Sequence, residues 1–257
     1  MIGRPALIWF TFITCVLVSS VNSDQGGDRQ RDFVRSLELF DKATTQDGFR
    51  ESARLLEALL ADGYCNGAVY YNLGNAYFRA GEFGRAILNY RKAKPYRPSD
   101  PLLEANLQQA LTSAPGKIAM PPKPWWSHVM FWTEYLAYST RVWIAIVGLG
   151  VAPLIVFSSV LFRRRNLIWV AIGLTVFGIV FSIDGYVNSP ERTTARLAVI
   201  IGETVARKGI GKEYESAFNA PLKDGAEFVI LNETNGWTFG HFAEIGDGWV
   251  KNDFVAK

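Results

Sequence analysis

The pattern of apolar positions divides the chain into three kinds of segment. Over residues 24–114 apolar residues recur at helical spacing, as at Ala53, Leu56 and Leu60, and no alternating stretch is long enough for a sheet. Residues 142–162 and 167–187 are long apolar runs, whereas residues 195–257 contain short β-rich runs separated by Gly and Asp-Gly turns. The pattern predicts a helical domain, two apolar helices and a C-terminal all-β domain, in that order.

The helical domain carries a repeat motif. Eight of its residues fall at the spacing of the 34-residue tetratricopeptide repeat: Tyr70, Leu73, Gly74, Tyr77, Ala86, Tyr90, Ala93 and Pro98. Ala53 precedes Ala86 by 33 residues, so residues 33–65 resemble a degraded earlier copy. With one further amphipathic helix after Pro98 as a cap, we expect about five helices. Two repeats are fewer than usual, so we expect the cap, the membrane or a partner to complete the core.

Repeats of this kind bind peptides or proteins along the concave face formed by the first helix of each pair. The residues expected on that face are Tyr71, Asn75, Phe78, Arg79, Asn106 and Gln109. Asn75 and Arg79 have the chemistry to hold a peptide carboxylate or backbone. The alternative is that these are ordinary solvated polar residues of a small helical domain.

Three features predict a membrane protein with both soluble domains on the outer side. Residues 1–23 have the basic start, apolar run and small-residue exit of a signal peptide, the alternative being an uncleaved anchor helix. The runs at 142–162 and 167–187 each approach the roughly 20 residues that cross a bilayer. The turn between them, residues 163–166, contains three arginines, which the positive-inside rule places in the cytoplasm. We therefore expect a bacterial inner-membrane protein with its soluble domains in the periplasm.

The segment before the first span, residues 115–141, is a linker rich in aromatic residues, which favour the lipid headgroup layer. An interfacial helix is expected over residues 127–140. Asp184 lies at the outer end of the second span, where we expect water to reach it. Pro153 is expected to kink the first span.

The C-terminal segment, residues 195–257, resembles a bacterial Src-homology-3-like (SH3-like) barrel, chiefly through the turns at Asn235-Gly236 and Gly246-Asp247-Gly248. The resemblance implies binding of cell-wall peptides or of other proteins. The candidate ligand groove consists of Trp237, Phe239, His241 and Phe242. Trp249 is expected in the barrel core, and His241 has no partner evident in the sequence.

Composition and charge argue against several functions. The formal net charge is only +3, and neither soluble domain concentrates the basic residues that binding to nucleic acid requires. The only cysteines are Cys15, in the signal segment, and Cys65, expected to be a small buried residue, so no internal disulfide remains after cleavage. We find no nucleophile with a base, no paired acids and no metal-ligand spacing. The sequence therefore predicts a non-enzymatic protein without a cofactor or metal site.

The order of segments resembles the E-type member of the bacterial aerotolerance-operon (Bat) family over nearly the whole chain. The most specific stretches are residues 71–77, 86–90 and 104–107. The resemblance implies partners among membrane proteins with von Willebrand factor type A domains and a MoxR-type ATPase system, in an envelope complex linked to stress or oxygen tolerance.

Two classes of function remain open at this point. In the first, the protein is a scaffold whose helical repeats bind a membrane partner. In the second, the barrel binds or senses peptidoglycan and the repeats only position it. Binding of the barrel to purified wall sacculi would distinguish the second class from the first.

Overall fold

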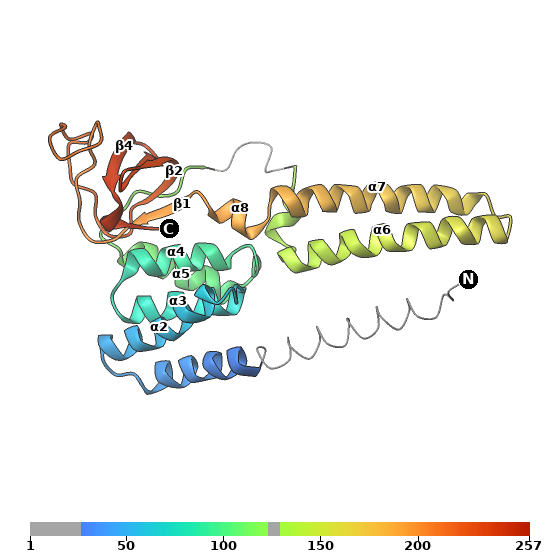
Figure 1. The fold of residues 1–257 in the computed structure, drawn as a ribbon, viewed down its shortest axis with the longest axis horizontal. Helices are drawn as coiled ribbons and strands as arrows, with labels where there is room; N and C mark the ends of the chain where they lie inside the picture. The colour runs from blue at the N-terminus through green and yellow to red at the C-terminus, as the bar shows by residue number, and fades with distance from the viewer. Residues whose placement is uncertain (1–26, 123–128) are drawn as a thin grey trace, which may run out of the picture.

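The computed structural model describes residues 27–122 and 129–257. The expected signal peptide, residues 1–23, lies outside the described residues, as do Trp125 and Trp126 of the aromatic linker. Figure 1 shows a helical stack and a small sheet together at one end of the molecule, and a long two-helix hairpin that extends from them.

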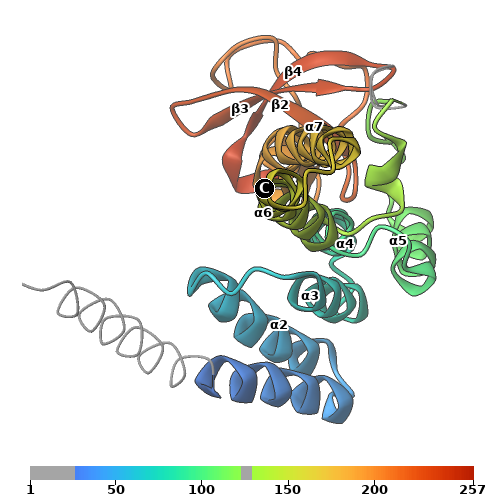
Figure 2. The ribbon, with the colours of Figure 1, turned by 90° about the vertical axis from the view of Figure 1, so that its right-hand side faces the viewer.

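The N-terminal part of the described chain is helical throughout, which confirms the prediction from apolar spacing. Its helices are residues 27–42, α2 (Gln46–Ala61), α3 (Gly67–Arg79), α4 (Phe83–Ala93) and α5 (Pro101–Ser113). Three of them begin at a polar residue whose side chain accepts hydrogen bonds from the first backbone N–H groups, namely Thr45, Asn66 and Asp100. Successive helices lie side by side (Figure 2). Assignment to the tetratricopeptide class stays a prediction.

Small residues allow the helices of this stack to approach closely. A Cβ atom on Gly74 of α3 would lie 2.6 Å from the ring of Tyr90 in α4. Ala76, Ala86 and Ala93 are buried in the same core. Cys65 is exposed, contrary to expectation, because it lies in the loop before α3 and the neighbouring Tyr64 packs on the core instead.

Two long apolar helices follow, α6 (Tyr138–Leu161) and α7 (Asn166–Val187), and both are long and apolar enough to cross a membrane. They pack along their length as an antiparallel pair (Figure 1). Gly148 and Gly178 permit the closest approach, since a Cβ on Gly148 would lie 3.2 Å from the Cα of Gly178. The side chains that face away from the pair are mostly large and apolar, and they are exposed.

The segment before α6 differs from expectation. Within the described part, the interfacial helix expected over 127–140 is reduced to one 3-10 turn, η2 (Phe131–Glu134), and α6 begins only at Tyr138. Contacts with other elements hold the segment in this shape: Trp132 packs on Phe181 of α7, and Ser99 donates to the carbonyls of residues 134 and 135.

Asp184 is not accessible to water, which corrects the sequence expectation. Its carboxylate lies 2.5 Å from Arg141 Nη1, and the two side chains are 1% and 2% exposed. Asn188, one turn later, donates to the other carboxylate oxygen at 2.7 Å. A buried charge needs a partner of opposite sign, so this ion pair fixes the register of α6 against α7 where the hairpin meets the soluble part.

The C-terminal part is a curled antiparallel sheet. A short helix, α8 (Pro190–Thr194), leads into it from α7. Its elements are β1 (Leu197–Ile200), β2 (Glu227–Thr234), β3 (Trp237–Phe242), β4 (Gly246–Lys251), η3 (Asn252–Phe254) and β5 (Val255–Ala256). The strand order is β4-β3-β2-β1-β5. The all-β prediction is confirmed for this segment, and the SH3-like class stays a prediction.

The sheet packs directly on the helical stack, although the two are far apart in sequence. Val199 of β1 belongs to the same apolar core as α3, α4 and α5. The carboxylate of Glu227, at the start of β2, accepts two hydrogen bonds from the guanidinium of Arg91 in α4, at 2.8 and 3.0 Å. Gly116, after α5, donates to the Asp224 carbonyl at 2.8 Å. The helices and the sheet therefore form one continuous body, with the sheet covering one face of α4.

Candidate functional site

Three of the six residues expected on the peptide-binding face come together between α3 and α5. The amide nitrogen of Asn106 lies 3.0 Å from Tyr71 Oη and 3.0 Å from Asn75 Oδ1. Tyr90, behind them in α4, donates its hydroxyl to the same Asn75 oxygen at 2.8 Å. The guanidinium of Arg97 lies over the Tyr71 ring, 4.6 Å from its centre. The result is a polar and aromatic surface whose side chains are held by one another.

The hydrogen bonds to Asn75 fix the orientation of its amide group. Because its oxygen accepts from both Tyr90 and Asn106, its nitrogen is directed away from them. Among the residues that the structure describes, no acceptor is bonded to that nitrogen, and the Asn75 side chain is partly exposed. The site thus presents an oriented N–H donor pair, suited to a carbonyl or carboxylate oxygen.

The other three expected residues do not join this group. Arg79, one turn beyond Asn75, places its guanidinium 5.0 Å from the ring centre of Phe49 in α2. Phe78 packs edge-on against Phe83. Gln109 is exposed on α5. The group of predicted residues that the structure brings together is thus smaller than expected, and the cation beside it is Arg97 rather than Arg79.

The outer face of the sheet brings together part of the predicted barrel groove. Residues alternate along β3, so Trp237, Phe239 and His241 point outward. Phe239 lies opposite Trp249 of β4, with ring centres 5.0 Å apart. Trp249 is partly exposed, so its expected place in the core is wrong. His241 does have a partner, since its Nδ1 lies 2.6 Å from Asp247 Oδ1.

Phe242 does not belong to a surface groove. It is fully buried and stacks on Phe228 with ring centres 4.6 Å apart. The strand period of two decides this, because Phe242 is one residue out of phase with Trp237 and Phe239. The aromatic surface of the sheet is therefore Trp237, Phe239 and Trp249, with His241 at its edge.

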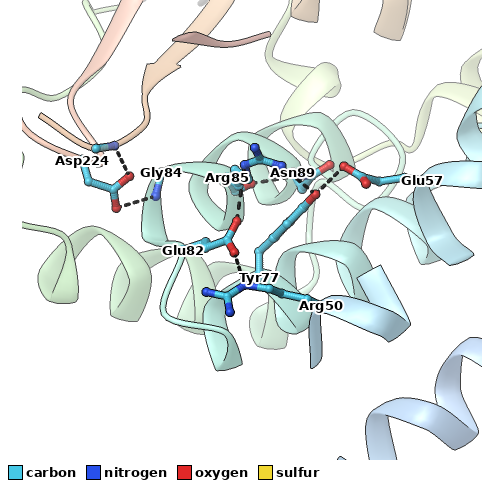
Figure 3. Close-up of polar contacts among 9 residues, drawn as sticks. Arg50, Glu57, Tyr77, Glu82, Gly84, Arg85, Asn89 and Asp224 are labelled. Atoms are coloured by element: carbon cyan, nitrogen blue, oxygen red, sulfur yellow. Dashed lines mark hydrogen bonds and ion pairs between the residues drawn. The ribbon is translucent and has the colours of Figure 1, made fainter. Parts of the chain in front are cut away.

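The sequence did not predict a cleft of about 420 Å³ between α2, α3, α4 and the end of β5. Figure 3 shows the polar side chains on its helical wall. The hydroxyl of Tyr77 bonds to Glu57, and Arg85 donates to that hydroxyl at 3.2 Å. Burial raises the pKa of Tyr77 to about 12 and lowers that of Lys92, which lines the same cleft. Periodicity within one helix cannot predict this cleft, because its walls come from the helical stack and from the C-terminal sheet, which are far apart in the sequence.

Asp224 joins the sheet to the first turn of α4. Its carboxylate oxygens accept from the backbone N–H group of Gly84 at 3.0 Å (Figure 3) and from that of Gly202 at 3.2 Å. A carboxylate at a helix N-terminus is favoured by the helix dipole. Burial nevertheless raises its pKa. A Cβ on Gly84 would lie 2.4 Å from the Ile200 carbonyl, so the contact requires glycine.

The described residues contain no cluster of three His, Cys, Asp or Glu side chains that could hold a metal ion. The candidate sites are instead the Asn75 group, with its oriented hydrogen-bond donors, and the aromatic surface of the sheet. No family model, curated protein or solved structure matches this chain.

Proposed function

We propose that this protein is a non-enzymatic, membrane-anchored scaffold that binds protein partners through its helical domain. The observation that carries the proposal is the Asn75 group, in which two side chains, Tyr90 of α4 and Asn106 of α5, orient the partly exposed Asn75 amide. An oriented donor flanked by Tyr71 and Arg97 suits an extended peptide segment, whose carbonyl groups accept and whose apolar side chains pack on an aromatic ring.

The anchor in this proposal is the hairpin of α6 and α7. The soluble parts before and after it contact each other through Arg91 and Glu227, so they occupy the same side of any membrane that the hairpin crosses. Arg163, Arg164 and Arg165 are exposed at the opposite end. The positive-inside rule assigns that turn to the cytoplasm and the soluble body to the outer side.

Cys65 provides a native probe of this topology, since its thiol is exposed. In a Cys15→Ala background, a membrane-impermeant maleimide added to intact spheroplasts should label Cys65. With Cys65 also changed to Ala, a cysteine introduced by Arg164→Cys should react only after the membrane is permeabilised. The reverse pattern would place the soluble body in the cytoplasm and overturn the assignment.

Partner binding is tested by purifying the tagged full-length protein in mild detergent and identifying retained proteins by mass spectrometry. Asn75→Asp keeps an acceptor for Tyr90 and Asn106 but removes the outward donors. We expect partner recovery to fall by roughly tenfold, the effect of losing one to two hydrogen bonds in a desolvated contact. Asn72→Asp, the same change three residues earlier on α3, is the matched control. Equal recovery with both variants would refute binding through Asn75.

The resemblance to the Bat family supplies the partners that we propose to look for. They are membrane proteins with von Willebrand factor type A domains and a MoxR-type ATPase system, in an envelope complex linked to stress or oxygen tolerance. Recovery of such proteins in a fixed ratio with the scaffold would support this assignment, and recovery of an unrelated set would contradict it.

A second candidate function is binding of peptidoglycan by the sheet, favoured by the paired outward rings of Phe239 and Trp249. Aromatic faces at a partly exposed surface suit an apolar sugar face or a peptide side chain. If this is the function, the full-length protein in detergent should sediment with wall sacculi. Trp249→Ala should abolish sedimentation, whereas Asn75→Asp should leave it unchanged.

A further inference from the structure

A groove runs along the outer half of the hairpin, between α6 and α7. Its α6 wall is a single helical stripe from Tyr138 through Val142 to Leu149, and its α7 wall includes Phe181 and Gly185. The volume is about 510 Å³. Two of its lining residues, Ile146 and Tyr186, are large side chains exposed on the surface of the hairpin. In a membrane the medium at this surface is lipid, so the occupant must be compatible with hydrocarbon.

The length of the groove fits one leaflet. Tyr138 and Leu149 are eleven residues apart on α6, which corresponds to about 16 Å along the helix axis. One leaflet contributes about half of a hydrocarbon core of about 30 Å. The groove is parallel to the helices, and therefore parallel to the acyl chains of a surrounding bilayer.

The mouth of the groove carries one charge of each sign. Arg192 and Glu191, on α8, both line it. The Arg192 guanidinium lies 4.0 Å from the ring centre of Tyr186, which holds it at the rim. Among the residues that the structure describes, neither Arg192 nor Glu191 takes part in an ion pair, whereas many other charged side chains are paired, as Arg91 is with Glu227 and Arg141 with Asp184.

We propose that this groove binds one molecule of phosphatidylethanolamine, with an acyl chain between α6 and α7, the phosphate on Arg192 and the ammonium group on Glu191. The proposal rests on the membrane placement proposed above. A guanidinium is well matched to a phosphate, and a carboxylate to a primary ammonium, whereas a purely anionic headgroup would leave Glu191 facing a like charge.

Gly185 keeps the groove open. A Cβ at this position would meet only Val142 Cγ2, at 3.8 Å, so a larger side chain would occupy the groove without striking the backbone of α6. Gly173, on the same helix, has no atom within 4 Å of its Cβ position and does not line the groove. Gly185→Leu and Gly173→Leu are therefore a matched pair, identical in chemistry and different only in the groove.

The test is native mass spectrometry of the full-length protein released from detergent micelles, with phosphatidylethanolamine or phosphatidylglycerol added in steps. We expect one tightly held phosphatidylethanolamine, at least tenfold weaker binding in Gly185→Leu, and unchanged binding in Gly173→Leu. Arg192→Gln, on exposed α8, should also weaken binding by about tenfold without affecting the hairpin. Glu191→Gln should abolish the preference for phosphatidylethanolamine over phosphatidylglycerol.

Equal lipid retention in Gly185→Leu and Gly173→Leu would overturn the proposal, as would equal affinity of the unmodified protein for the two lipids. Loss of folding in Gly185→Leu, seen as lost helicity, would leave Arg192→Gln and Glu191→Gln to decide. Washing membranes with alkaline carbonate distinguishes a failure of the lipid-binding proposal from a failure of the proposed membrane anchor. If the protein washes off, the membrane placement fails as well; if it stays and the variants have no effect, only the groove assignment fails.

Discussion

The ion pair between Arg91 and Glu227 joins the helical stack to the sheet, and replacing either partner tests how strongly the two depend on each other. The Glu227 side chain is 0% exposed and that of Arg91 is 30% exposed. Besides two hydrogen bonds from Arg91, Glu227 accepts one from the backbone N–H of Met120 at 3.3 Å. The two changes are therefore not equivalent, because they leave different groups behind.

Arg91→Met leaves a fully buried carboxylate with one backbone donor. Removing one member of a buried pair costs about 3–5 kcal/mol, and we expect the middle of that range, about 4 kcal/mol. Glu227→Gln keeps an acceptor and the side-chain shape, and the Arg91 left behind reaches water. We expect about 2 kcal/mol for this change. The double change Arg91→Met with Glu227→Leu should recover much of the loss, because an apolar pair of similar volume needs no charge compensation.

The measurement is thermal unfolding of the full-length protein in mild detergent, followed by tryptophan fluorescence. For a folded unit of about 150–250 residues, 1 kcal/mol shifts the midpoint by about 2–4 °C, so Arg91→Met should lower it by about 8–16 °C. Glu215→Gln removes an exposed ion pair with Lys208 in the sheet domain and is the control. It should shift the midpoint by no more than a few degrees. If Arg91→Met shifted the unfolding midpoint no more than this control does, the contact between the helical stack and the sheet would not stabilise the protein, and the stack and the sheet would be independent domains.

Two further predictions concern the helical core. Gly74→Ala should destabilise the protein by about 1–3 kcal/mol, because its Cβ would overlap the Tyr90 ring. Gly150→Ala is the control and should be close to neutral, because its Cβ would have nothing within 4 Å. Thermal unfolding of both variants checks this, and equal shifts of the midpoint would contradict it. Burial raises the folded-state pKa of Tyr77 to about 12 from its ordinary value of 10, so stability should fall as the pH rises from 10 towards 12, where the unfolded chain ionises first. Tyr77→Phe should be less stable than the unmodified protein at pH 8 and lose its disadvantage above pH 10, and a gap that stays constant with pH would refute this.

Some parts of the candidate sites were predictable from local spacing. Tyr71 and Asn75 are one helical turn apart, so both necessarily lie on the same face of α3. The same spacing also included Arg79, yet the structure directs Arg79 to Phe49 because α2 begins beside it. Spacing gives the side of a helix on which a residue lies, but the neighbouring helix decides what that residue contacts.

The sequence carries one signal of the contact between the helical stack and the sheet. Glu227 stands between Ala226 and Phe228 in an otherwise apolar strand start, and a charge at a position facing the core requires a buried partner. No local rule identifies that partner, because Arg91 is 136 residues away. The same reasoning applies to Asp184, which the sequence placed at the outer end of the second span without showing that it meets Arg141 of the first.

The sequence by itself determined the order and type of the elements: helices, two long apolar helices and an antiparallel sheet. This is because apolar periodicity and turn residues are local signals, which can be recognised within a few consecutive positions of the sequence. Only the tertiary structure decided that the sheet packs on α4, that Asn75 is oriented by Tyr90 and Asn106, and that Arg192 stands at the mouth of a groove. Those arrangements depend on contacts between distant residues, whose partners are chosen by packing and by the need to pair buried charges rather than by local pattern.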